Sequence, residues 1–162
     1  MDHSEAASAA PAIVVSRGTS TTGDPLNIFG DLIYVKLAGK DTQGRLCLME
    51  DVTQPGEGPP LHVHHREDEG FYVLDGDYRF EVDGRQMDAH TGDFFYVRRD
   101  IPHTFQNTGS KPGRLLLTLE PAGLEDFFAE LSRIEGPPLP EKVVPVFAKY
   151  GLELLGPPLA AR

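Results

Sequence analysis

Short extended segments, in which apolar residues recur between polar ones, follow one another from Asp31 to Leu119 and are separated by turn-forming sequences. Asp75-Gly76 and Asp83-Gly84 are strong hairpin signals among these turns. Closely spaced short strands with no helix between them predict an all-β fold, a closed antiparallel barrel or jelly roll. The expected strands are Asp31–Leu37, Arg45–Thr53, Leu61–His65, Gly70–Leu74, Tyr78–Val82, Gln86–Ala89, Asp93–Val97, His103–Asn107 and Arg114–Leu119.

After Pro121 the spacing of apolar residues changes to that of an amphipathic helix, formed by Leu124, Phe127, Phe128, Leu131 and Ile134. This helix is expected to close one side of the barrel or to take part in a subunit contact. A second short helix is expected over Glu141–Tyr150, in which Pro145 is acceptable only in the first turn and Gly151 ends the helix. Leu152–Leu155 is expected to return as a strand or to lie across the barrel mouth.

The chain is predicted to be one domain of 162 residues in three parts. Residues 1–24 are interpreted as a flexible tail, in which Ile13–Val15 could add an edge strand. Residues 25–120 form the barrel, and residues 121–162 form a helical extension packed on it. The acidic N-terminus resembles no signal peptide, and no apolar run reaches the roughly 20 residues of a membrane span, so we expect a cytoplasmic protein.

Charge and cysteine content narrow the classes of function. The net charge of −10 disfavours binding to nucleic acid and gives no attraction to anionic membranes. Cys47 is the single cysteine, so an intramolecular disulfide is excluded and a reducing compartment fits. We interpret Cys47 as a small buried hydrophobic residue rather than a catalytic one.

Histidines and a carboxylate at strand spacing point to a metal site. His62 and His64 share one face of a strand, and Glu69 opens the next extended run, so pairing of the two strands brings Glu69 beside the imidazoles. His103 is a fourth candidate ligand in a similar setting. The alternative is that His62 and His64 are ordinary surface residues of a strand.

Neighbouring polar residues are assigned no part in this site. His65 points away from the face of His64 and is expected at the rim. Glu67 and Asp68 are expected in a solvated turn, and His90, beside a glycine turn, is interpreted in the same way.

Two stretches of the sequence resemble the motifs of the cupin superfamily. The first, G-x5-H-x-H-x4-E-x6-G, is matched at Gly56, His62, His64, Glu69 and Gly76. The second is matched at Gly92, His103 and Asn107, but Arg98 and Asp100 stand where the family usually has Pro and Gly, which bears on the turn before His103. From about Leu26 onward the chain looks like the small single-domain cupins of the quercetin 2,3-dioxygenase type.

The resemblance implies a double-stranded β-helix that binds one divalent transition metal. Three imidazoles and one carboxylate suit Fe, Mn, Ni, Co or Zn and not the oxygen-only sites of calcium or magnesium. Four protein ligands leave coordination positions open for a small-molecule substrate or O2. Residues in phase with the ligands are expected to line the substrate pocket, or alternatively to be plain barrel core: Phe71, Val73, Phe105 and Asn107.

The activity that this resemblance favours is that of a metal-dependent dioxygenase. It would oxidise an enol- or hydroxyl-bearing, aromatic substrate with O2, and Glu69 would act as general base. Two alternatives remain open: redox-neutral chemistry at the same site (isomerisation, polyketide cyclisation or decarboxylation), and a non-catalytic small-molecule-binding cupin. Family members often pair as dimers, so a homodimer is compatible with the sequence.

Overall fold

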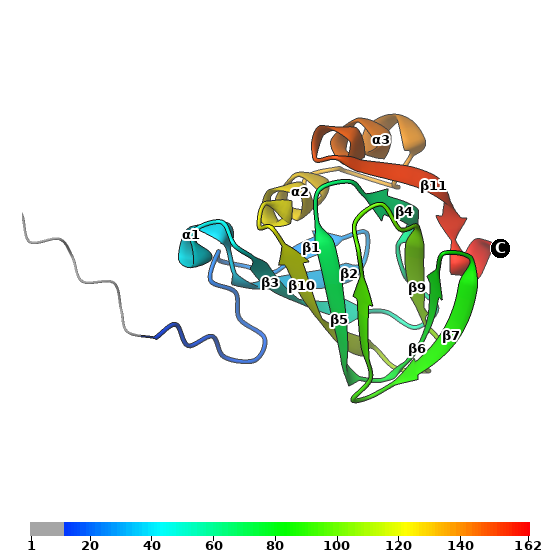
Figure 1. Cartoon of the computed structure of the whole chain (residues 1–162), viewed down its shortest axis with the longest axis horizontal. Helices are drawn as coiled ribbons and strands as arrows, with labels where there is room; N and C mark the ends of the chain where they lie inside the picture. Colours follow the sequence, from blue (N-terminus) through cyan, green and yellow to red (C-terminus); the bar gives the residue numbers. More distant parts are fainter. Residues whose placement is uncertain (1–11) are drawn as a thin grey trace, which may run out of the picture.

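The computed structural model describes residues 12–162 and contains two antiparallel sheets that face each other (Figure 1). The six-stranded sheet has the order β1-β2-β3-β10-β5-β8, and the five-stranded sheet has the order β11-β4-β9-β6-β7. This arrangement confirms the predicted all-β jelly-roll fold. The strands are β1 (Leu26–Ile28), β2 (Asp31–Leu37), β3 (Cys47–Thr53), β4 (Pro60–His64), β5 (Asp68–Asp75), β6 (Asp77–Val82), β7 (Arg85–His90), β8 (Phe94–Val97), β9 (His103–Asn107), β10 (Gly113–Glu120) and β11 (Leu152–Pro158).

The alternation of side chains along each strand decides what fills the space between the sheets. In β10, Leu115, Leu117 and Leu119 are buried, whereas the residues between them are only partly buried. These leucines meet an aromatic cluster at one end of the barrel, where Phe80 stacks on Phe95 with ring centroids 4.3 Å apart. The aromatic side chains fill part of the space between the sheets, and a cavity remains beside them.

Three α-helices complete the described chain: α1 (Gly39–Thr42), α2 (Leu124–Leu131) and α3 (Pro140–Lys149), followed by a short 3₁₀ segment, Leu159–Ala161. The apolar faces of α2 and α3 pack together at one end of the barrel (top in Figure 1). Gly151, in the left-handed conformation with φ 79°, follows the end of α3 and turns the chain into β11. Of the two expectations for Leu152–Leu155, the return as a strand is the one observed, since β11 pairs with β4.

The expected position of Pro145 is wrong. The helix starts at Pro140, and Pro145 lies inside it, beyond the first turn. A proline at that place removes the backbone hydrogen bond to the carbonyl of Glu141. Glu141 is exposed, so water can satisfy that carbonyl and the helix continues.

The predicted flexible tail lies partly outside the described residues, since residues 1–11 are not among them. Residues 12–24 contain no strand, so the suggested edge strand at Ile13–Val15 does not form, and the outer strand of this sheet is β1. The segment is nevertheless held against β2. Lys36 Nζ donates hydrogen bonds to the carbonyls of Ser16 and Thr19, at 3.0 and 2.8 Å.

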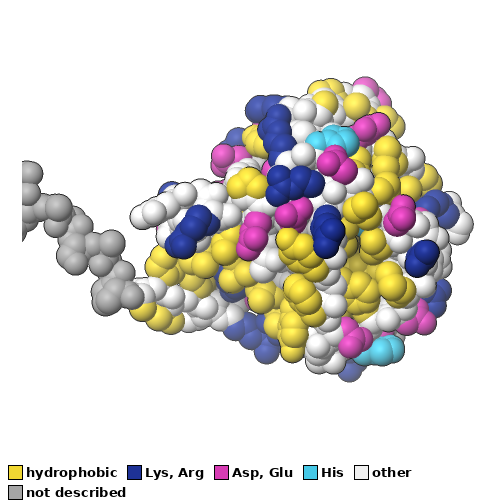
Figure 2. Space-filling view, viewed as in Figure 1, with side chains coloured by type: hydrophobic (Ala, Val, Ile, Leu, Met, Phe, Trp, Pro, Cys, Tyr) yellow, Lys and Arg dark blue, Asp and Glu magenta, His cyan; other side chains and the backbone are white. Residues whose placement is uncertain are grey.

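The outer face of β5 and β8 carries aromatic side chains among charged ones. Tyr72, Phe94 and Tyr96 are 42%, 58% and 52% exposed, and hydrophobic and charged side chains intermingle on the face shown in Figure 2. Exposed apolar surface of this kind is typical of protein contacts, although the homodimer stays a prediction. Among residues 12–162, every helix is too short or too polar to cross a bilayer.

Candidate metal centre

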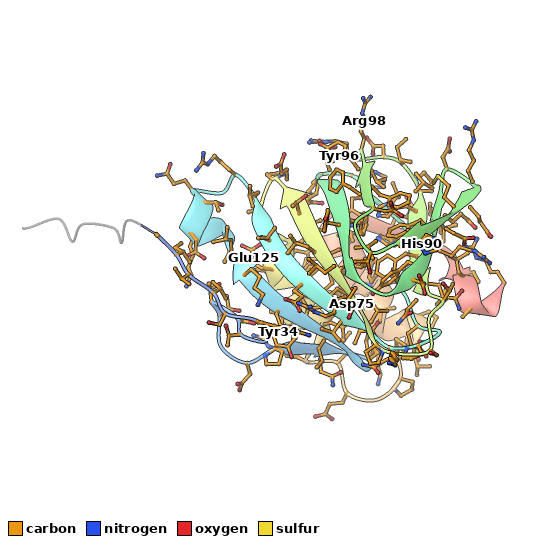
Figure 3. The ribbon with its side chains drawn as sticks, turned by 90° about the horizontal axis from the view of Figure 1, so that it is seen from below. Tyr34, Asp75, His90, Tyr96, Arg98 and Glu125 are labelled. Carbon is orange, nitrogen blue, oxygen red and sulfur yellow. The ribbon has the colours of Figure 1, made fainter. Side chains whose placement is uncertain are left out.

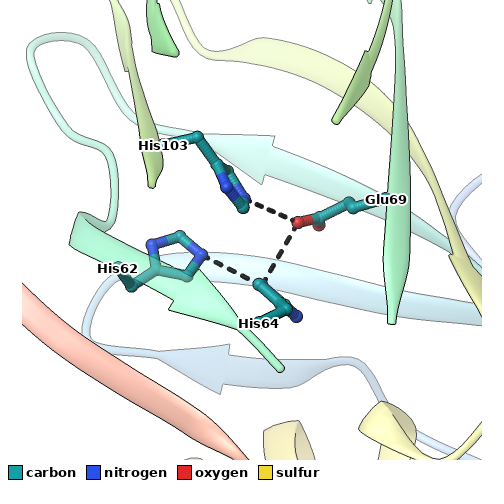
Figure 4. A group of neighbouring side chains, drawn as sticks. All are labelled: His62, His64, Glu69 and His103. Atoms are coloured by element: carbon teal, nitrogen blue, oxygen red, sulfur yellow. Dashed lines mark hydrogen bonds and ion pairs between the residues drawn. The ribbon is translucent and has the colours of Figure 1, made fainter. Parts of the chain in front are cut away.

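Four side chains from both sheets meet between them. His62 and His64 lie on β4, and His103 lies directly opposite His62 on β9, so the three imidazoles come from one sheet. Glu69 reaches them from β5 in the other sheet (Figure 4). Ligand atoms of all four residues lie within 4.8 Å of one another, and each side chain is buried.

The short distances join the Nε2 atoms to one another and to the carboxylate. His62 Nε2 lies 3.1 Å from His64 Nε2, and Glu69 Oε2 lies 3.0 Å from His103 Nε2 and 3.3 Å from His64 Nε2. Two imidazoles are oriented from behind by backbone carbonyls. Nδ1 of His62 donates to the carbonyl of Pro60 at 2.8 Å, and Nδ1 of His103 donates to that of Ile101 at 2.9 Å. This tautomer leaves both Nε2 atoms with free lone pairs, as metal ligation requires.

Burial and neighbouring charges set the protonation of these histidines. Desolvation, together with the nearby His103 and His64, holds the pKa of His62 well below its usual value. The pKa of His103 is raised instead: burial opposes its charged form, but the hydrogen bond and the negative charge of Glu69 outweigh that effect. A neutral His62 is the form that a metal binds.

The expectation that Glu67 lies in a solvated turn is wrong. Glu67 is only 5% exposed, and its Oε2 faces Nδ1 of His64 at 3.6 Å. Neither atom has a hydrogen-bond partner among the described residues. The alternation that points Glu69 inward also points Glu67 inward when it is continued back by two residues, which is the signal that could have located this carboxylate. Asp68 does lie at the surface side, where it binds Arg99.

Glu67 is placed to orient His64 as the carbonyls orient the other two imidazoles. We expect Glu67→Gln to weaken binding of a divalent metal about 10-fold, because outer carboxylates that hold a ligating histidine typically contribute 10- to 100-fold. Metal titration with a competing chelator measures this affinity. Glu135→Gln, at an exposed position outside the cavity, is the matched control, and an unchanged affinity in Glu67→Gln would contradict the orienting role.

The two departures from the second motif leave the turn before His103 intact. Asp100 adopts the left-handed conformation, φ 65°, for which glycine is usual and which aspartate tolerates better than most residues. Its backbone N–H donates to the carbonyl of His64 at 2.7 Å, and its carboxylate accepts a hydrogen bond from Nδ1 of His65. His65 is therefore at the exposed rim, as expected. Arg98 and His90 lie on the outside of the barrel (Figure 3).

A cavity of about 680 Å³ opens beside the four ligands. His62, His64 and Glu69 line it, whereas His103 lies behind them and is 2% exposed. This volume falls in the range of small-molecule sites, roughly 300–1,000 Å³. The side of the ligand group that faces the cavity is therefore accessible to a small molecule.

Two of the four expected pocket residues line this cavity. Phe71 and Phe105 form its wall, next to the ligands. Val73 does not line it: this side chain is fully buried, although Asp51, at the same level in the strand register, does line the cavity. Asn107 is also fully buried, and its side chain holds a loop by donating to the carbonyls of Thr53 and Lys111. The alternation of side chains along a strand predicts which face a residue occupies, but not whether its side chain reaches the cavity.

Most of the cavity lining comes from segments that the sequence does not connect with the site. Helices α2 and α3 and strand β11 supply apolar side chains over the mouth, among them Phe127, Leu131, Val143, Phe147 and Leu154. Besides Glu69, three carboxyl groups line the cavity: Asp31, Asp51 and the exposed Glu57. Asp51 could have been recognised as a charged residue on the inner face of an otherwise apolar strand.

The donor set fits a divalent transition metal. Three imidazole nitrogens and one carboxylate oxygen, all buried and mutually close, are the ligands that first-row metals prefer. The unpartnered Nδ1 of His64 and Oε2 of Glu67 form the outer pair that typically accompanies such a ligand. The cluster could therefore hold one metal ion through His62, His64, Glu69 and His103.

Comparison with known proteins finds a family model that matches the part of the chain carrying the site. The Cupin domain model matches residues 49–119. Quercetin 2,3-dioxygenase of Bacillus subtilis (strain 168) is 28% identical over 112 residues, 69% of this chain and 33% of that protein. The tetracenomycin polyketide synthase protein TcmJ of Streptomyces glaucescens is 26% identical over 86 residues, 53% of this chain and 56% of that protein. The chain thus spans less than two thirds of either relative's length.

Solved structures show the same fold. KdgF from Halomonas sp. superposes with a TM-score of 0.58 over 65% of this chain and 92% of that chain, at 17% sequence identity. The matched domain model covers both stretches from which the four ligands come. The match of residues 49–119 to the Cupin domain and the spacing of the ligands together support a cupin domain in this part of the chain, and the solved structure shares its fold.

Proposed function

We propose that this protein is a metal-dependent dioxygenase that oxidises an enol- or hydroxyl-bearing aromatic molecule with O2. The observation that carries the proposal is the position of the four-residue ligand group at the wall of a mainly apolar cavity. A metal needed only for structure would be enclosed by its ligands, whereas this group has one side open. The similarity to a quercetin 2,3-dioxygenase supports the oxidative form of the chemistry.

The cavity wall suits an aromatic substrate. Phe71, Phe105 and Leu117 line it between the ligands and the deeper carboxyl groups, and Phe127 and Phe147 cover it from the helices. Such a wall excludes water and buries a flat apolar ring, which strengthens electrostatic interactions at the site. A bound divalent metal would act there as a Lewis acid that lowers the pKa of a coordinated hydroxyl.

Glu69 is the residue that we assign as general base. Its Oε2 is shared between His103 and His64, so the carboxylate can leave one of these partners and accept a proton from the substrate hydroxyl. His103, whose pKa Glu69 raises, stabilises the negative charge of the carboxylate until then. Among the cavity-lining acids, Glu69 is the one that belongs to the ligand group.

Oxygen uptake tests the proposal. The metal content of the purified protein is measured first, and flavonols, diketones and phenolic acids are then screened with an oxygen electrode. We expect O2 consumption in step with product, and formation of the same product without O2 would overturn the dioxygenase.

The role of Glu69 has its own test. We expect Glu69→Gln to keep much of the bound metal and to lower turnover by about 100-fold or more, within the range of general-base contributions. Metal content and turnover are measured on the same sample. Unchanged turnover at equal metal content would eliminate the base role.

A redox-neutral reaction at the same site is the second candidate. It is favoured by the similarity to the polyketide synthase proteins TcmJ of Streptomyces glaucescens and CurC of Streptomyces cyaneus. The electrode experiment separates the two, since a cyclisation or isomerisation gives product under argon with no O2 uptake.

A further inference from the structure

Two carboxyl groups lie side by side on the inner face of β2 and β3. Ile33 lies opposite Asp51 in the register of these strands, so Asp31, two residues before Ile33, is the diagonal neighbour of Asp51 on the same face. Both residues line the cavity, and Asp51 is only 7% exposed. Neither group belongs to the metal ligands.

Each carboxyl group has one oxygen engaged and one oxygen free. Asp51 Oδ1 accepts a hydrogen bond from Thr53 Oγ1 at 3.0 Å, and Asp31 Oδ1 accepts one from the backbone N–H of Gln54 at 2.8 Å. No hydrogen bond within residues 12–162 reaches the second oxygen of either group. Asp51 is more than nine-tenths buried, and one of its carboxyl oxygens has no hydrogen-bond partner among the residues described. Because this oxygen lies at the cavity wall, it can form a hydrogen bond with a molecule in the cavity.

The pair holds one proton at neutral pH. Burial, followed by the charge of Asp31, raises the pKa of Asp51 to about 8, and burial raises that of Asp31 to about 6, with a further contribution from Glu57. Two neighbouring carboxylates in an apolar cavity cannot both ionise easily, so the pair is best treated as a single proton-sharing unit. It therefore offers one O–H donor and one charged acceptor.

The pair lies far from the metal ligands along the barrel. Glu69 on β5 is opposite Leu119 on β10, and Leu119 is opposite Cys47 on β3. Asp51 is four residues further along β3, which is roughly 13 Å in the strand direction. Phe71 and Leu117 lie between these two regions, so the cavity has a ligand group at one part, an acid pair at another and apolar walls between them.

We propose that Asp31 and Asp51 form a second polar subsite that selects substrates carrying a neutral hydroxyl group at the end remote from the metal-binding group. The hydroxyl donates to the Asp31 carboxylate and accepts from the Asp51 carboxylic acid, so both carboxyl groups are satisfied by one substituent. An ammonium group loses more hydration energy than a hydroxyl on entering this mainly apolar cavity, and it offers no acceptor to a protonated Asp51. A carboxylate is repelled, since no Lys or Arg among residues 12–162 lines the cavity.

This subsite deepens the proposed function, on which it rests, because the opposite end of the substrate is assumed to lie at the four-residue ligand group. A binding experiment without turnover tests it separately. Zinc-loaded protein is titrated under argon with 3-hydroxyflavone and with its 4′-hydroxyl, 4′-carboxylate and 4′-aminomethyl derivatives, and the dissociation constants are measured by fluorescence. No oxidation is required, so a failed dioxygenase assay leaves this result unaffected.

We expect the 4′-hydroxyl probe to bind the wild type about 10-fold more tightly than the unsubstituted probe, as one added charge-assisted hydrogen bond provides. The carboxylate probe should bind at least roughly 100-fold more weakly than the hydroxyl probe, and the aminomethyl probe also more weakly. In Asp31→Leu/Asp51→Leu the preference for the hydroxyl should disappear. In Asp31→Asn/Asp51→Asn, which keeps the size of both side chains, the carboxylate should no longer be excluded.

Asp83→Asn is the matched control, because Asp83 is an exposed turn residue whose left-handed conformation asparagine also accepts. It should bind all four probes as the wild type does. Equal binding of the hydroxyl and unsubstituted probes to the wild type would overturn the proposal. So would tighter binding of the aminomethyl probe, no binding of the hydroxyl probe, or a hydroxyl preference that survives in both double variants with native circular dichroism.

Discussion

His103→Ala should lower the affinity for a divalent metal by about 100-fold or more and abolish turnover, while the protein stays folded. The substitution removes one of four ligands, a larger loss than the 10- to 100-fold typical of an outer partner. It also leaves Glu69 without the imidazole that accompanies its Oε2 at 3.0 Å. The barrel should persist because its core is the cluster of leucine and aromatic side chains deeper in the fold. Metal content by elemental analysis and far-ultraviolet circular dichroism measure the two effects.

His90→Ala is the matched control for this experiment. His90 is an exposed histidine that pairs with Asp77 on the outside of the barrel, so its removal should leave metal content unchanged. A normal metal content in folded His103→Ala would contradict the four-residue site.

Asp51→Asn should make the free energy of unfolding much less dependent on pH between about 5 and 8. The folded-state pKa of Asp51, about 8, lies above the ordinary value of 3.8, so the folded protein holds a proton that the unfolded chain has lost. The wild type therefore loses stability as the pH rises through this window, at no more than about 1.4 kcal/mol per pH unit. Asparagine cannot ionise, so the stability of the variant relative to wild type should increase by about 2–3 kcal/mol from pH 5 to pH 8.

Urea unfolding at several pH values, in the presence of a chelator, measures this difference. The chelator matters because a bound cation would itself lower the pKa of nearby acids. The groups that act on Asp51 are Asp31 on β2 and Glu69 on β5, and the phenol of Tyr78 on β6 joins it through Thr53. Subtracting the wild-type curve cancels titrations that both proteins share. A constant difference between the two curves would show that Asp51 ionises normally in the folded state.

The strand pattern and the ligand spacing could be predicted from local sequence. Alternation within a strand depends only on neighbouring residues. The local sequence therefore predicted that His62 and His64 share a face, and it predicted the strands from β2 to β10. The boundaries shifted by only a few residues. The same rule, extended by one step, would also have turned Glu67 inward, but a turn was expected there because charged residues follow one another.

Depth along the barrel was not predictable in the same way. Phe71 and Val73 have the same parity on β5, yet Phe71 lines the cavity and Val73 is enclosed by the core. The difference depends on which side chains of other strands pack against each residue, since Asp51 on β3, at the same level as Val73, does line the cavity. Asn107 lies on the same strand as His103, but its side chain donates hydrogen bonds to the carbonyls of Thr53 and Lys111 and so holds a loop in place.

The sequence by itself predicted the resemblance to cupins, the all-β architecture and the four candidate ligands, since each depends on residue type at short, regular spacing. Only the tertiary structure decided that Glu67 lies beside His64, which side chains of the C-terminal helices line the cavity, and that Asp31 and Asp51 share its wall. These are contacts between segments distant along the chain, and burial changes the protonation of a carboxyl group only after those segments have packed around it.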